Sequence, residues 1–200
     1  MNKKVFCGLI LLAVFSLAAC STSMPATKIY TLYIPAEQQT NIQKGDASVV
    51  ITVDAERYLQ QPYIAYRNSP YELEISKYSK WGSAPGKIIG RELQAALSST
   101  GLFKDIKLSR VRSKGDYLIK INLINFERSG DKSAPAGILV FDIDFISPDG
   151  KEIYSSTVSK KEKLGSNSFS SLAEGLSRSL EQGLAEVKED IAVALHNEGK

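Results

Sequence analysis

The chain has 200 residues, of which 43% are hydrophobic and 24% are charged, and its formal net charge at pH 7 is +3. This balance lacks the basic surplus that is typical of nucleic-acid-binding proteins. The only histidine, His196, lies in a polar C-terminal tail, where neither a catalytic triad nor a histidine metal site is expected. The length suits one domain with a sizeable core.

The N-terminus has the pattern of a secretory signal. Lys3 and Lys4 precede an apolar run from Val5 to Ala19, which is too short to span a bilayer comfortably. The stretch Leu17-Ala18-Ala19-Cys20 resembles the lipobox of bacterial lipoproteins, in which the cysteine is acylated and becomes the first residue. We therefore predict a signal peptide over residues 1–19 and a lipid anchor on Cys20.

Two alternatives to the lipid anchor stay open: an ordinary signal peptide with an incidental cysteine, and an uncut N-terminal membrane anchor. Three acyl chains would hold the protein on a membrane permanently, whereas one chain gives only marginal attachment. Cys7 would leave with the signal, so the mature chain could form no intrachain disulfide. Ser21, rather than Asp, follows the cysteine, and in the Gram-negative sorting scheme this favours the outer membrane, facing the periplasm.

Residues 20–28 predict a lipidated cysteine and a short tether, because they are small, polar and interrupted by Pro25. A single domain is expected over 29–197. Its first half alternates β-branched and aromatic residues in several runs separated by turn-forming residues. The predicted elements are a strand over 29–34, a loop over 36–46, a strand over 47–55 and a hairpin over 63–67 and 71–75.

The first helix is predicted from Ser83, as the N-cap residue, to Gly101, which suits a left-handed position after the last turn. Pro85 lies in the first turn, where a missing amide proton does no harm. Apolar residues recur at helical spacing, at Ile89, Leu93, Ala96 and Leu97. A further strand is expected over 102–110.

The second half predicts three strands and one long helix. Strands are expected over 116–128 and 138–147, with a bulge or a change of face where Phe126 breaks the alternation. A turn at 148–150 leads into a polar, lysine-bearing strand suited to a sheet edge. The final helix, 169–195, carries one apolar stripe, and Ser171 with Glu174 suggests a capping box.

The predicted fold class is α+β: an antiparallel or mixed sheet with two helices packed on one face, in a single domain. The polar side of the alternating strands indicates that the other face is solvated or covered by a partner.

Several residue patterns resemble functional sites, and each is better explained as an ordinary structural feature. Asp142 and Asp144 point to the same side of one strand, which favours a solvated sheet face over a catalytic pair. The stretch 129–132 has serine and lysine at the spacing of serine acylases but lies in a loop, and 82–87 is one residue short of a phosphate-binding loop. Two groups of basic residues could face anionic lipid head groups or an acidic partner, but solvated loop charges explain them more simply. They are Arg110, Arg112 and Lys114, and Lys160, Lys161 and Lys163. No enzyme, cofactor or metal site is predicted.

The stretch from Tyr71 to Ile106 contains a strand, an aromatic-rich turn with the only tryptophan, and an amphipathic helix ending in Gly-Leu-Phe. Together with Tyr30-Thr31-Leu32 soon after the cysteine, it resembles the ABC-type transport auxiliary lipoproteins, the PqiC-like family, over about residues 29 to 195. The longer loop after Ala36 and Gly82-Ser83 depart from the expected pattern.

The resemblance implies a non-catalytic subunit of a system with an ABC ATPase, a permease and an MCE-domain protein, which moves apolar molecules between membranes. The chain would dock the MCE-domain protein at the outer membrane. Tyr78 and Trp81 are the implied partner-binding residues, because an aromatic pair beside a helix start suits an interface. The alternative for Trp81 is a core position against Leu93 and Leu97.

Two other functions stay open. The chain could instead be an assembly or chaperone lipoprotein for an outer-membrane complex or a cell-wall synthase, and the identity of its partner separates these readings. A direct lipid carrier would need an apolar cavity, whereas the stripe of the last helix is expected to be fully used by the sheet. Self-association around an MCE conduit is compatible with the first function, because such conduits are ring-shaped, and the sequence sets no number of copies.

Overall fold

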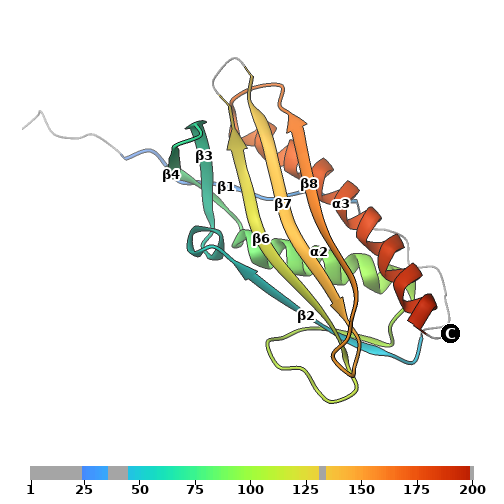
Figure 1. Cartoon of the computed structure of the whole chain (residues 1–200). Coiled ribbons are helices and arrows are strands. Elements are labelled where there is room, and N and C mark those ends of the chain that lie inside the picture. Colours follow the sequence, from blue (N-terminus) through green and yellow to red (C-terminus); the bar gives the residue numbers. More distant parts are fainter. Residues whose placement is uncertain (1–23, 36–44, 131–133, 199–200) are drawn as a thin grey trace, which may run out of the picture.

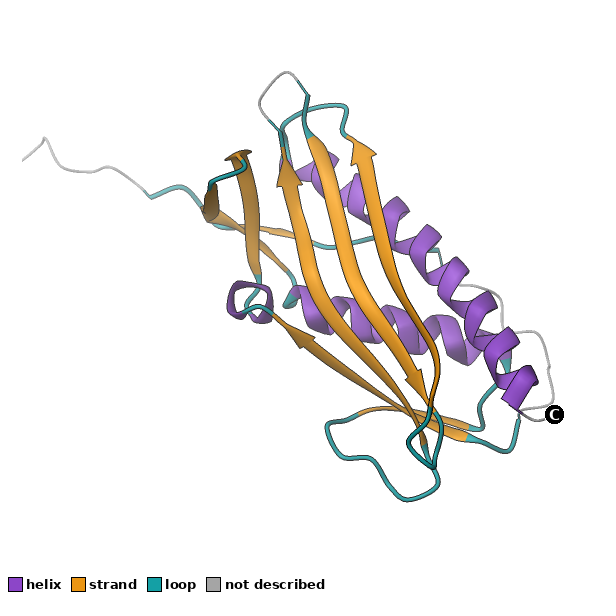
Figure 2. Ribbon diagram, viewed as in Figure 1, coloured by secondary structure: helices purple, strands orange, loops and turns teal. Residues whose placement is uncertain are grey.

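The computed structural model describes residues 24–35, 45–130 and 134–198. The predicted signal peptide and Cys20 lie outside these residues. Figure 1 shows a twisted sheet with two helices on one side of it, and Figure 2 gives the same view coloured by helix, strand and loop. The expected α+β class, with a mixed sheet and two helices on one face in a single domain, is therefore confirmed.

A long central strand, β6 (Tyr117–Ser129), organises the sheet. On one side it pairs antiparallel with β7 (Ala136–Ile146), which in turn pairs with β8 (Glu152–Lys163). On its other side two strands lie parallel to it in succession, β2 (Ser48–Ala55) along its first half and β3 (Tyr63–Ser69) along its second. The 3₁₀ turn η1 (Arg57–Gln60) separates β2 from β3.

Three further strands complete the sheet beyond β2 and β3. β4 (Glu72–Trp81) forms a hairpin with β3, and β1 (Lys28–Tyr30) adds parallel to β4. β5 (Asp105–Leu108) adds parallel to β2. The predicted strands 29–34 and 102–110 are thus shorter than expected, whereas the second hairpin strand continues six residues further, through Trp81. The bulge expected near Phe126 is present as a register shift between Leu123 and Asn125.

Helices α2 (Pro85–Thr100) and α3 (Phe169–Glu198) cover the same face of the sheet. Gly101 ends α2 in the left-handed conformation, with φ 68°, as predicted. The predicted cap at Ser83 is wrong, because Ala84 is the N-cap residue and has no side-chain cap hydrogen bond.

The capping box at Ser171 and Glu174 is also wrong. Ser168 Oγ accepts the amide proton of Ser171 at 3.1 Å, so the cap lies three residues earlier. The Glu174 carboxylate instead accepts a hydrogen bond from Arg178, one turn further along the helix.

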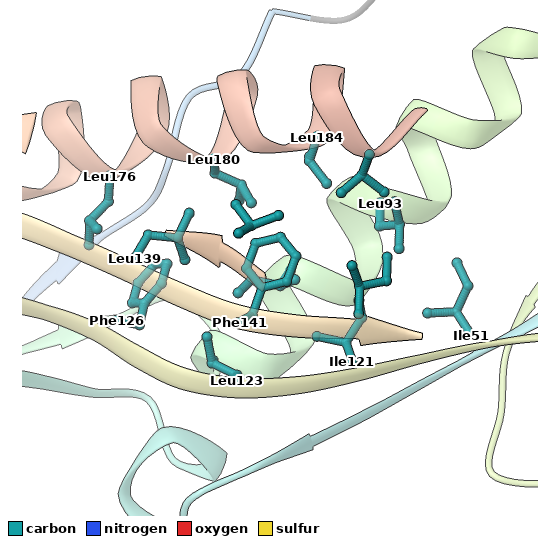
Figure 3. Packing of buried hydrophobic residues seen from close by; sticks show 14 of the residues in the cluster. Ile51, Leu93, Ile121, Leu123, Phe126, Leu139, Phe141, Leu176, Leu180 and Leu184 are labelled. Carbon is teal, nitrogen blue, oxygen red and sulfur yellow. The ribbon is translucent and has the colours of Figure 1, made fainter. Parts of the chain in front are cut away.

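The core lies between the helices and the inward face of the long strands, and Figure 3 shows these side chains meeting. Alternate residues of β7, such as Phe141 and Ile143, are buried, while the residues between them are only half-buried. The α3 stripe, which includes Leu176, Leu180 and Leu184, packs onto them from above. This arrangement confirms that the apolar stripe of the last helix is used by the sheet.

Candidate functional site

A groove of about 550 Å³ lies between the first half of α2 and strands β2 and β5. It exists because β5 is short: its partners on β2 end at Ile51, whose carbonyl accepts the amide proton of Ser109 at 3.2 Å. From Thr52 onward, no described strand pairs with this edge of β2. The groove therefore follows a free sheet edge, a place where an extended partner segment can lie.

The floor of the groove is apolar and shallow because two glycines of α2 face the strands. A Cβ at Gly86 would lie 3.5 Å from Val53 Cγ1, and a Cβ at Gly90 would lie 3.0 Å from Leu108 Cδ2. The helix backbone thus comes close to β2 and β5, and Leu108 stays partly exposed beside it. Gln60 closes one end, since its Nε2 donates to the Ala55 carbonyl at 2.7 Å.

The rim of the groove is basic. Lys87, Arg91 and Arg110 all line it and are exposed, and none of them forms an ion pair with the described residues. Arg91 Nη1 donates a hydrogen bond to Ser83 Oγ at 3.4 Å. No Asp or Glu is among the described residues that line the groove. Its chemistry therefore fits a segment that carries carboxylates beside apolar side chains.

The cations of the rim do not stand together in the sequence. Lys87 ends the stretch 82–87, which is one residue short of a phosphate-binding loop, and Arg110 belongs to a basic group that is more simply explained as solvated charges. Lys87 and Arg91 are four residues apart, as are Gly86 and Gly90, so each pair lies along one face of a helix. That spacing is the signal that could have revealed the groove.

Other members of the two basic groups have structural partners. Arg112 Nε donates to the Asp116 carbonyl at 2.8 Å, and its Nη2 donates to the Ser147 carbonyl. Lys160 Nζ forms an ion pair with Glu186 at 2.5 Å. Arg112 thus holds the loop before β6 in place. Arg110, in contrast, lines the groove.

Tyr78 and Trp81 do not form a joint surface. Trp81 is 2% exposed and meets Phe126 edge-on, with ring centroids 5.2 Å apart, inside the cluster that also holds Leu93 and Leu97. Tyr78 is partly exposed. Residues three apart in a strand point to opposite faces, and β4 includes both positions. Trp81 therefore occupies the core position, which was the alternative to an interface position, and its ring is not exposed to a partner.

The remaining polar candidates are part of the sheet surface. Asp142 accepts a hydrogen bond from Thr157 at 2.7 Å, and Asp144 accepts one from Ser155 at 2.8 Å, each from the residue directly across the β7–β8 pair. His196 lies exposed in the last turn of α3. Within residues 24–35, 45–130 and 134–198, no cluster of His, Cys, Asp and Glu could hold a metal ion.

No helix in the described part of the chain is long and apolar enough to cross a membrane. No curated protein matches the chain. Two solved structures share its fold at low identity. Protein XCC0632 from Xanthomonas campestris is 18% identical, with a TM-score of 0.73, covering 86% of this chain and 99% of that one. An uncharacterised protein is 16% identical, with a TM-score of 0.66, covering 84% of this chain and 99% of that one.

The family model for the ABC-type transport auxiliary lipoprotein component matches residues 30–192. The match begins within β1 and ends within α3, so it takes in every element that forms the sheet, the two helices and the groove. The chain therefore belongs to the family of ABC-type transport auxiliary lipoprotein components.

Proposed function

We propose that this chain is a non-catalytic outer-membrane lipoprotein that docks the MCE-domain protein of an ABC-type lipid transport system. In this proposal an acylated Cys20 anchors it on the periplasmic side of the membrane, after removal of residues 1–19. The MCE-domain protein would link it to the ABC permease and ATPase. The chain itself supplies position rather than covalent chemistry.

The observation that carries the docking role is the groove beside α2. A free sheet edge offers backbone groups to an extended segment, and the apolar floor offers contacts to its side chains. The cations Lys87, Arg91 and Arg110, which form no ion pair within the described part of the chain, then favour carboxylates on that segment. We assign the groove to an acidic, partly apolar segment of the MCE-domain protein.

Co-purification from native membranes tests this assignment. The variant Lys87→Glu/Arg91→Glu reverses two rim charges on exposed positions, so the fold should be unaffected. The matched control, Lys161→Glu/Lys163→Glu, reverses two exposed charges on the edge strand β8. We expect the wild type and the control to retain the MCE-domain protein and the groove variant to lose most of it.

Three results would count against the proposal in different ways. Equal recovery of the MCE-domain protein with both variants would remove the groove from the docking site. Recovery of a secretin, an outer-membrane barrel or a cell-wall synthase in its place would support the assembly or chaperone function. A stoichiometric phospholipid in the purified protein, displaced by neither variant, would favour a direct lipid carrier.

Intact-mass measurement of the purified native protein tests the anchor separately. The proposal predicts a chain that begins at residue 20 and carries the added mass of three acyl chains. An unmodified cysteine, or cleavage at another residue, would refute the anchor and leave the groove assignment to be judged by co-purification.

A further inference from the structure

The β3–β4 hairpin ends in an exposed aromatic tip. Ser69 pairs with Glu72, and the two residues between them are Pro70 and Tyr71. Tyr71 is 95% exposed, the highest value among the exposed large hydrophobic side chains of the described residues. In Figure 1 this hairpin lies at the end of the molecule from which the N-terminal segment leaves.

The N-terminal segment leaves along β4 and toward that tip. β1 is parallel to β4, and Lys28 pairs with Ser79. The two strands run in the same direction, and β4 begins at the hairpin tip. The chain before Lys28 therefore approaches β1 from the side of the tip. Met24 and Ile29, on either side of the start of β1, expose most of their apolar side chains.

The tether is long enough to reach the hairpin tip. From Cys20 to Lys28 the chain reaches about 26 to 29 Å when fully extended. The hairpin is shorter: β3 takes six residue steps from Tyr63, opposite Lys80, to Ser69, opposite Glu72, which is about 20 Å at the usual rise of a strand. A lipid anchor at Cys20 is therefore within reach of a bilayer surface that meets the hairpin tip.

The exposed side chains of the hairpin suit that surface. Tyrosine is enriched where membranes meet water, because its ring is apolar and its hydroxyl is polar. Ile75 is also partly exposed on the hairpin, whereas Tyr63 and Lys80, which pair with each other, lie at the end away from the tip. The Glu74 carboxylate, also in the hairpin, accepts hydrogen bonds from the Tyr66 hydroxyl and the Asn68 side-chain amide.

We propose that the β3–β4 tip, residues 69–72, inserts Tyr71 into the interfacial layer of the membrane that holds the lipid anchor. This inference rests on the proposed anchor at Cys20. The tip is a second contact with the bilayer, and it fixes the orientation of the domain. The loop between β5 and β6 then lies at the opposite, periplasmic end of the molecule.

A single fluorescent label tests the proposal, because the acylated mature chain has no free thiol of its own. Tyr71→Cys is labelled with an environment-sensitive fluorophore and reconstituted, with its lipid anchor, into vesicles of phosphatidylethanolamine and phosphatidylglycerol. The matched control is Lys114→Cys, an exposed position in the loop between β5 and β6. Flotation of the vesicles confirms that each labelled chain is membrane-bound.

We expect the label at 71 to shift to shorter wavelength and to be quenched by bromine-bearing lipids, while the label at 114 keeps its emission in water. A floating protein whose label at 71 behaves as it does in water would overturn this proposal and leave the anchor intact. A protein that does not float, and whose Cys20 has no acyl mass, would instead refute the anchor. A blue shift at 71 without vesicles would assign the tip to a protein contact rather than to the bilayer.

Discussion

Arg67 and Glu127 form an ion pair across the parallel β3–β6 junction, with Nε 2.7 Å from Oε1. The Glu127 side chain is only 3% exposed, and it also accepts a hydrogen bond from Asn125 at 3.3 Å. Arg67 is on β3 and Glu127 is on β6, so the pair ties β3 to the second half of β6.

Loss of one partner of this pair should destabilise the fold strongly. Arg67→Ala leaves a buried carboxylate without its cation, and we expect the free energy of unfolding to fall by about 3 kcal/mol, as for other broken buried pairs. Urea unfolding measures the change. The double replacement Arg67→Met/Glu127→Leu should cost less than Arg67→Ala, because no charge is left unpaired, and a larger loss in the double variant would contradict this reasoning.

Alkaline pH should weaken the same region through Tyr58. Burial, followed by the charge of Glu127, raises the pKa of Tyr58 from 10.0 to about 12. The native state therefore holds the proton more tightly than the unfolded chain does, so this contribution to stability is complete below pH 10 and is lost between pH 10 and about 12.

The variant Tyr58→Phe isolates this contribution. It should lose less stability than the wild type between pH 10 and about 12, which are the unfolded and folded pKa values of Tyr58. Urea midpoints measured across that range provide the comparison. Parallel curves for the two proteins would show that Tyr58 is not the group that titrates.

The two aromatic residues of β4 should respond differently to truncation. Trp81→Ala removes a fully buried ring beside Phe126 and should cost about 3 to 5 kcal/mol. Tyr78→Ala changes a partly exposed side chain and should stay within about 0.5 kcal/mol, the usual range for surface substitutions. Thermal melts of both variants check this, and an unchanged melting temperature for Trp81→Ala would contradict its core position.

The start of α3 should depend on a buried arginine. The Arg128 guanidinium lies 4.8 Å from the Tyr66 ring centroid and 5.6 Å from that of Phe169, and its Nη1 donates to the Asn167 carbonyl at 2.5 Å. Burial lowers the pKa of Arg128. Arg128→Lys keeps the charge but loses the planar group that stacks between rings, so we expect a loss of about 1 to 2 kcal/mol.

Hydrogen exchange locates that loss. Amides in the first turns of α3 should exchange faster in Arg128→Lys, while those in the last turns should keep wild-type rates. The conservative Lys188→Arg replacement near the other end of α3 is the control. Uniform acceleration along the helix would contradict a local role for Arg128.

The strongly patterned elements could be predicted from the sequence, and the pairings between distant strands could not. The stripe of α3, the alternation of β7 and the polar edge strand β8 follow from the spacing of apolar residues. The parallel joining of β2 and β3 to β6 depends on tertiary packing, which no local pattern encodes. The segment after β1 has a strand-like sequence, yet the amide of Tyr33 donates to Ser177 Oγ at 3.0 Å on α3 instead of joining a strand.

The candidate site was less predictable than the fold. The sequence left Trp81 open between an interface and a core position because the strand was expected to end near Ile75, so the alternation of β4 was not applied to it. Lys87 and Arg110 are far apart in the sequence, and only the early end of β5 brings them to one groove. A cluster of this kind depends on where a strand stops, which is the least certain feature of a sequence pattern.

Photo-crosslinking in intact envelopes tests the docking role most directly. A photoreactive amino acid at Arg91, in the groove, is compared with one at Lys163, on β8, and the captured proteins are identified by mass spectrometry. We expect the MCE-domain protein to be captured from position 91 and not from position 163. Capture of a secretin, an outer-membrane barrel or a cell-wall synthase from position 91, with no MCE-domain protein, would contradict it.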